Sequence, residues 1–86
     1  MKLREEGLSW QELDGEIVVL DLVKSVYLRI NGSGTALWRR LAEGADRDEL
    51  VSSLTEAYDV EEQQAARDVE LFVTDLRQQG LLAAAE

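Results

Sequence analysis

The 86-residue chain contains no cysteine, no histidine and no proline. Without cysteine it can form neither a disulfide nor a zinc–thiolate site, and it has no thiol nucleophile. Without histidine it lacks the side chain that serves most zinc sites and most general bases. We therefore expect no metal, no cofactor and no catalytic residue, and the missing cysteines fit a reducing cytoplasm.

Basic residues are also scarce, because 9 Lys and Arg stand against 18 Asp and Glu, a formal net charge of −9. Such a field repels phosphate backbones and attracts cationic partners. No apolar run approaches the roughly 20 residues that span a bilayer. The N-terminal MKLREEGLSW lacks the apolar segment of a signal peptide. The sequence predicts a soluble, intracellular, acidic protein that binds neither nucleic acid nor membrane.

The chain is long enough for one domain only, which we expect to span residues 1–86. Its first seven residues are mostly charged and end at Gly7, and this composition predicts a loose lead-in. Regular apolar spacing begins at about Leu8 and continues to about Leu82, so the core is expected between these residues. The final residues, AAAE, are expected to be frayed.

Alternating apolar and polar side chains predict three short strands at the start of the chain. The first begins at Leu8 and leads to Asp14-Gly15, a pair typical of the type I′ hairpin turn. The second, Glu16 to Leu22, is nearly all apolar, as in a central strand with both faces covered. The third runs from Val26 to Ile30. Tight links make these strands an antiparallel meander whose third strand has one free edge.

Helical spacing replaces this alternation after the third strand. Asn31 and Ser33 are both placed to cap a first helix, and Gly44 suits its C-terminal end. Asp46 with Glu49 three residues later matches a capping box, which predicts the start of a second helix.

Asp59 with Glu62 repeats this capping pattern and predicts a third, longest helix that stops at Gly80. Its apolar stripe consists of Ala65, Val69, Phe72, Val73 and Leu76. Three strands followed by three helices predict a compact α+β fold, a three-stranded antiparallel sheet of winged-helix-like type.

Catalysis and DNA binding are both disfavoured by the residues present. No two carboxylates share an apolar sequence setting that would raise a pKa for acid–base work. Gly32-Ser33-Gly34 lacks the Walker and GxGxxG spacings, so we interpret it as a permissive strand-to-helix turn. A winged-helix DNA-binding regulator is the alternative from fold alone. The third helix, however, carries few basic residues among many acidic ones, which a DNA groove would repel.

Peptide binding is the function that the third strand favours. Its free edge exposes unpaired N–H and C=O groups, a template for an added strand. On the third helix, Phe72 and Leu76 are spaced to reach a groove beside this strand, with Leu71 nearby. The predicted peptide-binding residues are Val26, Tyr27, Leu28, Arg29, Ile30, Asp68, Leu71, Phe72, Asp75 and Leu76.

An ordered set of motifs accompanies these elements from about Leu8 to Leu82. It comprises the hairpin of acidic and branched residues, Y-x-x-I-N-x-x-G-x-x-L-W from Tyr27, D-x-x-E-L from Asp46, the Tyr58-x-Val60 step and D-V-x-x-F-V-x-x-L-x-x-x-G-L-L from Asp68. The sequence thereby resembles the PqqD-like family, the RiPP precursor-peptide recognition elements. One departure is Ile30, where the family more often has Leu before the Asn.

The resemblance implies a non-catalytic module that binds the leader of a ribosomally made precursor peptide. In the family the leader adds as a strand to the third strand and lies against the third helix. Carried over, Tyr27 to Ile30 would supply the edge, Phe72 and Leu76 would line the groove, and Asp68 and Asp75 would form its polar rim.

The resemblance also implies partners. With no enzyme domain in the 86 residues, the chain resembles the free-standing modules of lasso-peptide pathways. Its expected partners are the leader, a separate leader peptidase and the macrolactam-forming cyclase that follows. The alternative is recognition of a precursor in another RiPP or a pyrroloquinoline-quinone-type pathway.

Overall fold

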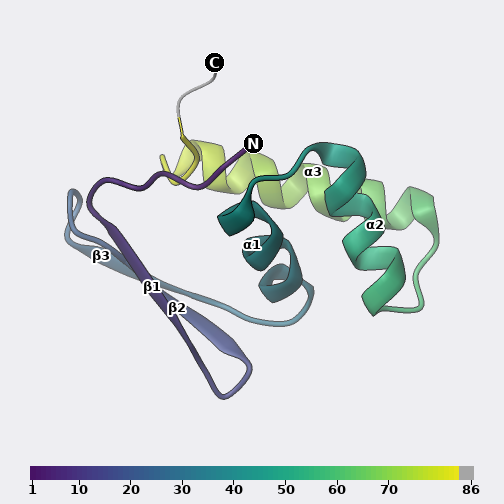
Figure 1. Cartoon of the computed structure of the whole chain (residues 1–86), viewed down its shortest axis with the longest axis horizontal. Helices are drawn as coiled ribbons and strands as arrows, with labels where there is room; N and C mark the ends of the chain where they lie inside the picture. The colour runs from purple at the N-terminus through teal and green to yellow at the C-terminus, as the bar shows by residue number, and fades with distance from the viewer. Residues whose placement is uncertain (84–86) are drawn as a thin grey trace.

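A three-stranded sheet and three helices make up the computed structural model, which describes residues 1–83 (Figure 1). The elements are β1 (Leu8–Leu13), β2 (Glu16–Asp21), β3 (Val26–Ile30), α1 (Ser33–Glu43), α2 (Arg47–Ala57) and α3 (Glu62–Gln78). The predicted α+β order is confirmed, and "winged-helix-like" describes it loosely. None of the helices in the described part of the chain is long and apolar enough to cross a membrane.

The sheet is an antiparallel meander in the order β1-β2-β3. The turn between β1 and β2 is formed by Asp14 and Gly15, whose φ angles of 52° and 80° are both positive, as the predicted type I′ turn requires. The predicted central position of β2 is confirmed, and β3 lies at an edge of the sheet.

Only one face of the sheet is covered by helices, so the prediction that β2 has both faces covered is wrong. Ile17 and Val19 point toward the helices and are fully buried, whereas Leu20 points away and is 46% exposed. All three helices follow the sheet in sequence and lie on the same side of it, with α2 packed against α1 and α3 (Figure 1). The outer face therefore stays open to solvent despite its apolar residues.

The core lies between the sheet and the helices, and Trp38 is its largest fully buried side chain. Trp10 on β1 meets the Trp38 ring edge-on, at a centroid distance of 6.0 Å and an interplanar angle of 82°. The apolar stripe predicted for α3 is confirmed for its four buried members, Ala65, Val69, Val73 and Leu76.

The helix starts only partly follow the predicted caps. The capping box of α2 is confirmed, because Glu49 N donates to Asp46 Oδ1 at 2.8 Å and Asp46 N donates to Glu49 Oε1 at 3.1 Å. The N-terminal caps predicted for α1 and α3 are wrong, whereas Gly44 does end α1 as predicted. Gly32 precedes α1 with a φ of 60°, so that Asn31 lies too early and Ser33 is already helical. Likewise α3 starts after Glu61 without a side-chain cap, two residues beyond Asp59.

The first residues are packed against the body of the protein, so the prediction of a loose lead-in is wrong. Leu3 is only 6% exposed and forms an antiparallel bridge with Leu82. Arg4 N donates to Leu81 O at 2.8 Å, and Ala83 N donates to Lys2 O at 2.9 Å. The core thus begins before Leu8. Of the tail that was expected to be frayed, residues 84–86 lie outside the described part of the chain.

Arg4 connects the sheet to the end of α3. Its guanidinium donates to Asp21 Oδ1 and to Gly80 O, both at 2.7 Å. The Asp21 side chain is 2% exposed and also accepts the backbone N–H groups of Val23 and Lys24. The hydrogen bond from Arg4 lowers the pKa of the Asp21 carboxyl below its ordinary value of 3.8, which outweighs the opposing effect of burial.

We predict that Asp21→Asn destabilises the fold in a pH-dependent way. The folded-state pKa is lowered, so the carboxylate contributes stability that is fully present above 3.8 and is lost as the pH falls through the lowered pKa. Urea unfolding of wild type and variant should show a gap at about pH 6 that shrinks towards about pH 3. Glu16→Gln, which removes an exposed pair with Arg29, should have little effect at either pH. A gap of constant size would contradict the assignment.

Candidate peptide-binding site

The backbone of β3 has one side without hydrogen-bond partners. It pairs with β2 on the other side, and in the described residues no backbone hydrogen bond joins its free edge to another segment. In an antiparallel pair, alternate residues direct their N–H and C=O groups outward from the edge. The edge is therefore available to an added strand, as the sequence predicts.

Three apolar side chains of β3 lie on the face of the sheet that carries the helices, but the helices do not fully cover them. Val26, Leu28 and Ile30 are opposite the buried side chains of β2 and share their face. Yet Val26 is 48% exposed, and Leu28 and Ile30 are only half-buried. The helices therefore cover the inner face of β2 fully and that of β3 only in part. This leaves a strip of partly exposed apolar side chains along the inner side of β3, next to α3, which we call the groove.

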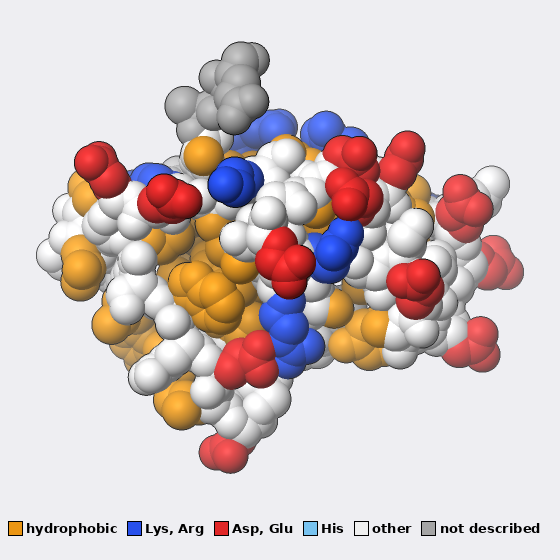
Figure 2. Space-filling view, viewed as in Figure 1, with side chains coloured by type: hydrophobic (Ala, Val, Ile, Leu, Met, Phe, Trp, Pro, Cys, Tyr) orange, Lys and Arg blue, Asp and Glu red, His pale blue; other side chains and the backbone are white. Residues whose placement is uncertain are grey.

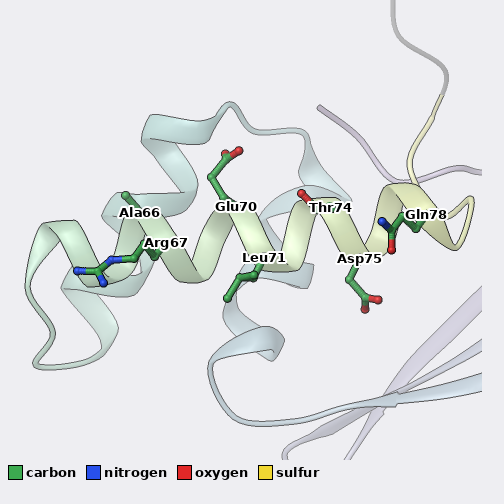
Figure 3. Close-up of a pocket in the computed structure, with 7 residues that line it drawn as sticks. All are labelled: Ala66, Arg67, Glu70, Leu71, Thr74, Asp75 and Gln78. Atoms are coloured by element: carbon green, nitrogen blue, oxygen red, sulfur yellow. The ribbon is translucent and has the colours of Figure 1, made fainter.

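The opposite wall of the groove comes from α3. Phe72 is half-buried, and its ring and the Ile30 side chain both approach Gly34 in α1, so it lies at the end of the groove where β3, α1 and α3 meet. Asp68 is half-buried one turn before Phe72 on the same side of the helix. In Figure 3 the exposed side chains of Leu71 and Asp75 point to the side of α3 on which the strands of the sheet are drawn.

Other predicted site residues are placed differently. Leu76 is 2% exposed and belongs to the core, which leaves its side chain almost no surface for a ligand. Tyr27 and Arg29 direct their side chains to the outer face of the sheet, where Arg29 Nη2 lies 3.1 Å from Glu16 Oε1. Tyr27 and Arg29 can therefore contribute to the site only through their backbone groups at the edge of β3.

The rim of the groove is anionic. Asp68 and Asp75 accept hydrogen bonds of 2.9 Å from the neutral amides of Gln64 and Gln79. Among the described residues neither carboxylate has an arginine or lysine within ion-pair distance. On the face shown in Figure 2, acidic side chains predominate over the helices, whereas apolar ones gather over the sheet. The rim thus favours a cationic ligand group.

A shallow furrow on the solvent side of α3 adjoins this rim (Figure 3). It is lined by Ala66, Arg67, Glu70, Leu71, Thr74, Asp75 and Gln78. Leu71, which is 72% exposed, and Asp75 thus present both an apolar and an acidic group next to the groove.

Among the described residues, the carboxyl groups with pKa values shifted from the ordinary range are those of Glu12 on β1 and Asp21 at the end of β2. The pKa of Glu12 is lowered mainly by a hydrogen bond from Arg39, and that of Asp21 mainly by one from Arg4. Each carboxylate is thereby held ionised, which suits an ion pair between elements rather than proton donation.

An unpaired strand beside an apolar groove and a helix defines a class of small α+β modules that accept an extended peptide by strand addition. Residues 16–82 match the sequence profile of PqqD, coenzyme PQQ synthesis protein D, and the chain belongs to this family. The family resemblance seen in the motifs is thus confirmed.

Two solved structures are similar over nearly the whole chain. TbiB1 in complex with the TbiA(beta) leader peptide is 27% identical, with a TM-score of 0.89 over 100% of this chain and 99% of that one. Lasso peptide synthetase B1 complexed with the leader peptide is 29% identical, with a TM-score of 0.84 over 96% of both chains. No curated protein sequence matches the chain.

Proposed function

We propose that this chain is a recognition module for the leader of a ribosomally synthesised precursor peptide in lasso-peptide biosynthesis. The observation that carries the proposal is the free edge of β3 beside an apolar groove. It is supported by the likeness to two proteins whose structures contain a bound leader peptide.

In the proposed complex the leader adds as a fourth strand to β3. Backbone hydrogen bonds along the edge supply sequence-independent affinity, and side chains in the groove supply specificity. Because side chains alternate along a strand, every second leader residue faces Leu28, Ile30 and Phe72. The residues between them join the outer face of the sheet beside Tyr27. A leader with apolar side chains at alternate positions fits this geometry.

The module acts by presenting the leader, without changing it covalently. It delivers the precursor in the cytoplasm to a separate leader peptidase, and the cyclase of the same pathway acts afterwards. A second candidate is delivery of a precursor in a pyrroloquinoline-quinone-type pathway, which the match to the PqqD family favours. Binding to DNA is disfavoured because α3 exposes more acidic than basic side chains.

Incubation of the purified chain with its precursor should leave the precursor's mass unchanged. Addition of the leader peptidase of the same pathway should then release the leader. Mass spectrometry of both mixtures distinguishes presentation from catalysis. Cleavage or modification by the chain alone would rule out the non-catalytic role.

Strand addition should protect the free edge of β3 from hydrogen exchange. When leader is added, backbone amides of Val26–Ile30 that point away from β2 should exchange more slowly, because they become hydrogen bonded. Amides of β1, at the opposite edge, should change little and serve as the internal control. Protection confined to α2 would place the leader elsewhere.

Asp75→Ala and Leu71→Ala should each weaken leader binding by about two- to fivefold, because both residues lie at an exposed rim. For Asp75→Ala the effect should be largest at low salt, where a cationic leader is attracted most strongly. Glu56→Ala removes an equal charge from exposed surface on α2 and should leave affinity nearly unchanged. Fluorescence anisotropy with a labelled leader, at two salt concentrations, measures all three. Binding that tightens as salt rises would contradict the charge assignment.

A further inference from the structure

Gly34 lies within the first turn of α1, and its backbone gives no reason for glycine there. The chain has six glycines, and five of them adopt positive φ angles. Gly34 is the exception. Glycine is a weak helix former compared with alanine, so local propensity does not favour it at this position. The reason therefore has to lie in the space around its Cα atom.

That space is taken by two side chains of the groove. A Cβ atom on residue 34 would lie 2.9 Å from Ile30 Cγ2, 3.2 Å from Phe72 Cε1 and 3.7 Å from Phe72 Cδ1. The first distance is shorter than carbon atoms tolerate, and the second is tight. An alanine here would force Ile30 or Phe72 to move.

The direction of that movement follows from burial. On the core side, Leu37 and Val73 are at most 1% exposed, and a close-packed interior resists a displaced ring. Phe72 and Ile30 are half-buried and border the groove. Displaced side chains would therefore enter the groove and fill part of it.

We propose that Gly34 is a positioning residue that sets the depth of the groove at its α1 end. With glycine, the ring of Phe72 rests close to the backbone of α1 and leaves room for a bulky apolar side chain of the bound peptide. This inference rests on the proposed function and adds to it a selectivity, namely for a large apolar residue at the leader position that faces Phe72 and Ile30.

The binding test uses the TbiA(beta) leader peptide as probe, with Gly34→Ala, Phe72→Leu, the double variant and Ser33→Ala. Ser33→Ala is the matched control, one residue earlier on an exposed site. Gly34→Ala should weaken binding roughly tenfold without lowering Tm, because overpacking acts on the groove while alanine favours the helix. In the Phe72→Leu background the same change should cost clearly less, because leucine has no Cε1 atom.

A second readout separates positioning from a general structural effect. Alanine substitutions along the probe should identify one apolar position whose truncation costs wild type much affinity and costs Gly34→Ala little. Equal affinity of wild type and Gly34→Ala would overturn the inference, as would a Gly34→Ala effect of the same size in both Phe72 backgrounds.

A measurement without peptide distinguishes failure of this inference from failure of the proposed function. NMR shifts of the Phe72 ring and the Ile30 methyl groups should change in Gly34→Ala and stay in place in Ser33→Ala. If wild type does not bind the probe while these shifts move, leader binding fails for that probe and the groove-shaping role of Gly34 stands. Unmoved shifts would overturn that role whatever the binding result.

Discussion

The guanidinium of Arg4 connects the sheet to the end of α3 and so fixes the position of the helices relative to the sheet. It bonds Asp21 at the end of β2 and the carbonyl of Gly80 just after α3. Close by, Lys24 Nζ donates to Gln79 O at 2.7 Å, so the turn that leads into β3 is also attached to the end of α3. Because the groove is the space between β3 and α3, these bonds fix one end of it. A site built for an extended peptide thus depends on a residue of the N-terminal segment that never borders it.

Much of this fold is predictable because its signals are local. The turn at Asp14-Gly15, the capping box of α2 and the apolar stripe of α3 each depend on residues a few positions apart. The mistaken expectations concern tertiary contacts. Leu3 lies between two charged residues and belongs to no periodic pattern, although it is buried and forms an antiparallel bridge with Leu82. The apolar run of β2 predicts two covered faces, but only the arrangement of the helices decides how many are covered.

The same difference between local signals and tertiary contacts decides which parts of the site are predictable from the sequence. The free edge of β3 follows from strand order, and the positions of Phe72, Asp68 and Asp75 follow from helical phase. Helical phase alone does not distinguish a residue that lines the groove from one in the core. Leu76 is predicted to line the groove but lies in the core. The role of Gly34 cannot be predicted from local sequence at all, because it depends on contacts where β3, α1 and α3 meet.

The open edge of β3 also affects how readily the protein associates with a second copy of itself. The open edge of β3, with exposed Val26 and Tyr27, is a template for the same edge of a second copy. A net charge of −9 makes two copies repel each other near neutral pH, and this protection fades toward the isoelectric point of about 4.4. A bound leader would occupy the edge and remove the template altogether. The peptide would then act as a solubilising partner for its own receptor, and the unloaded module would be the form most prone to aggregate.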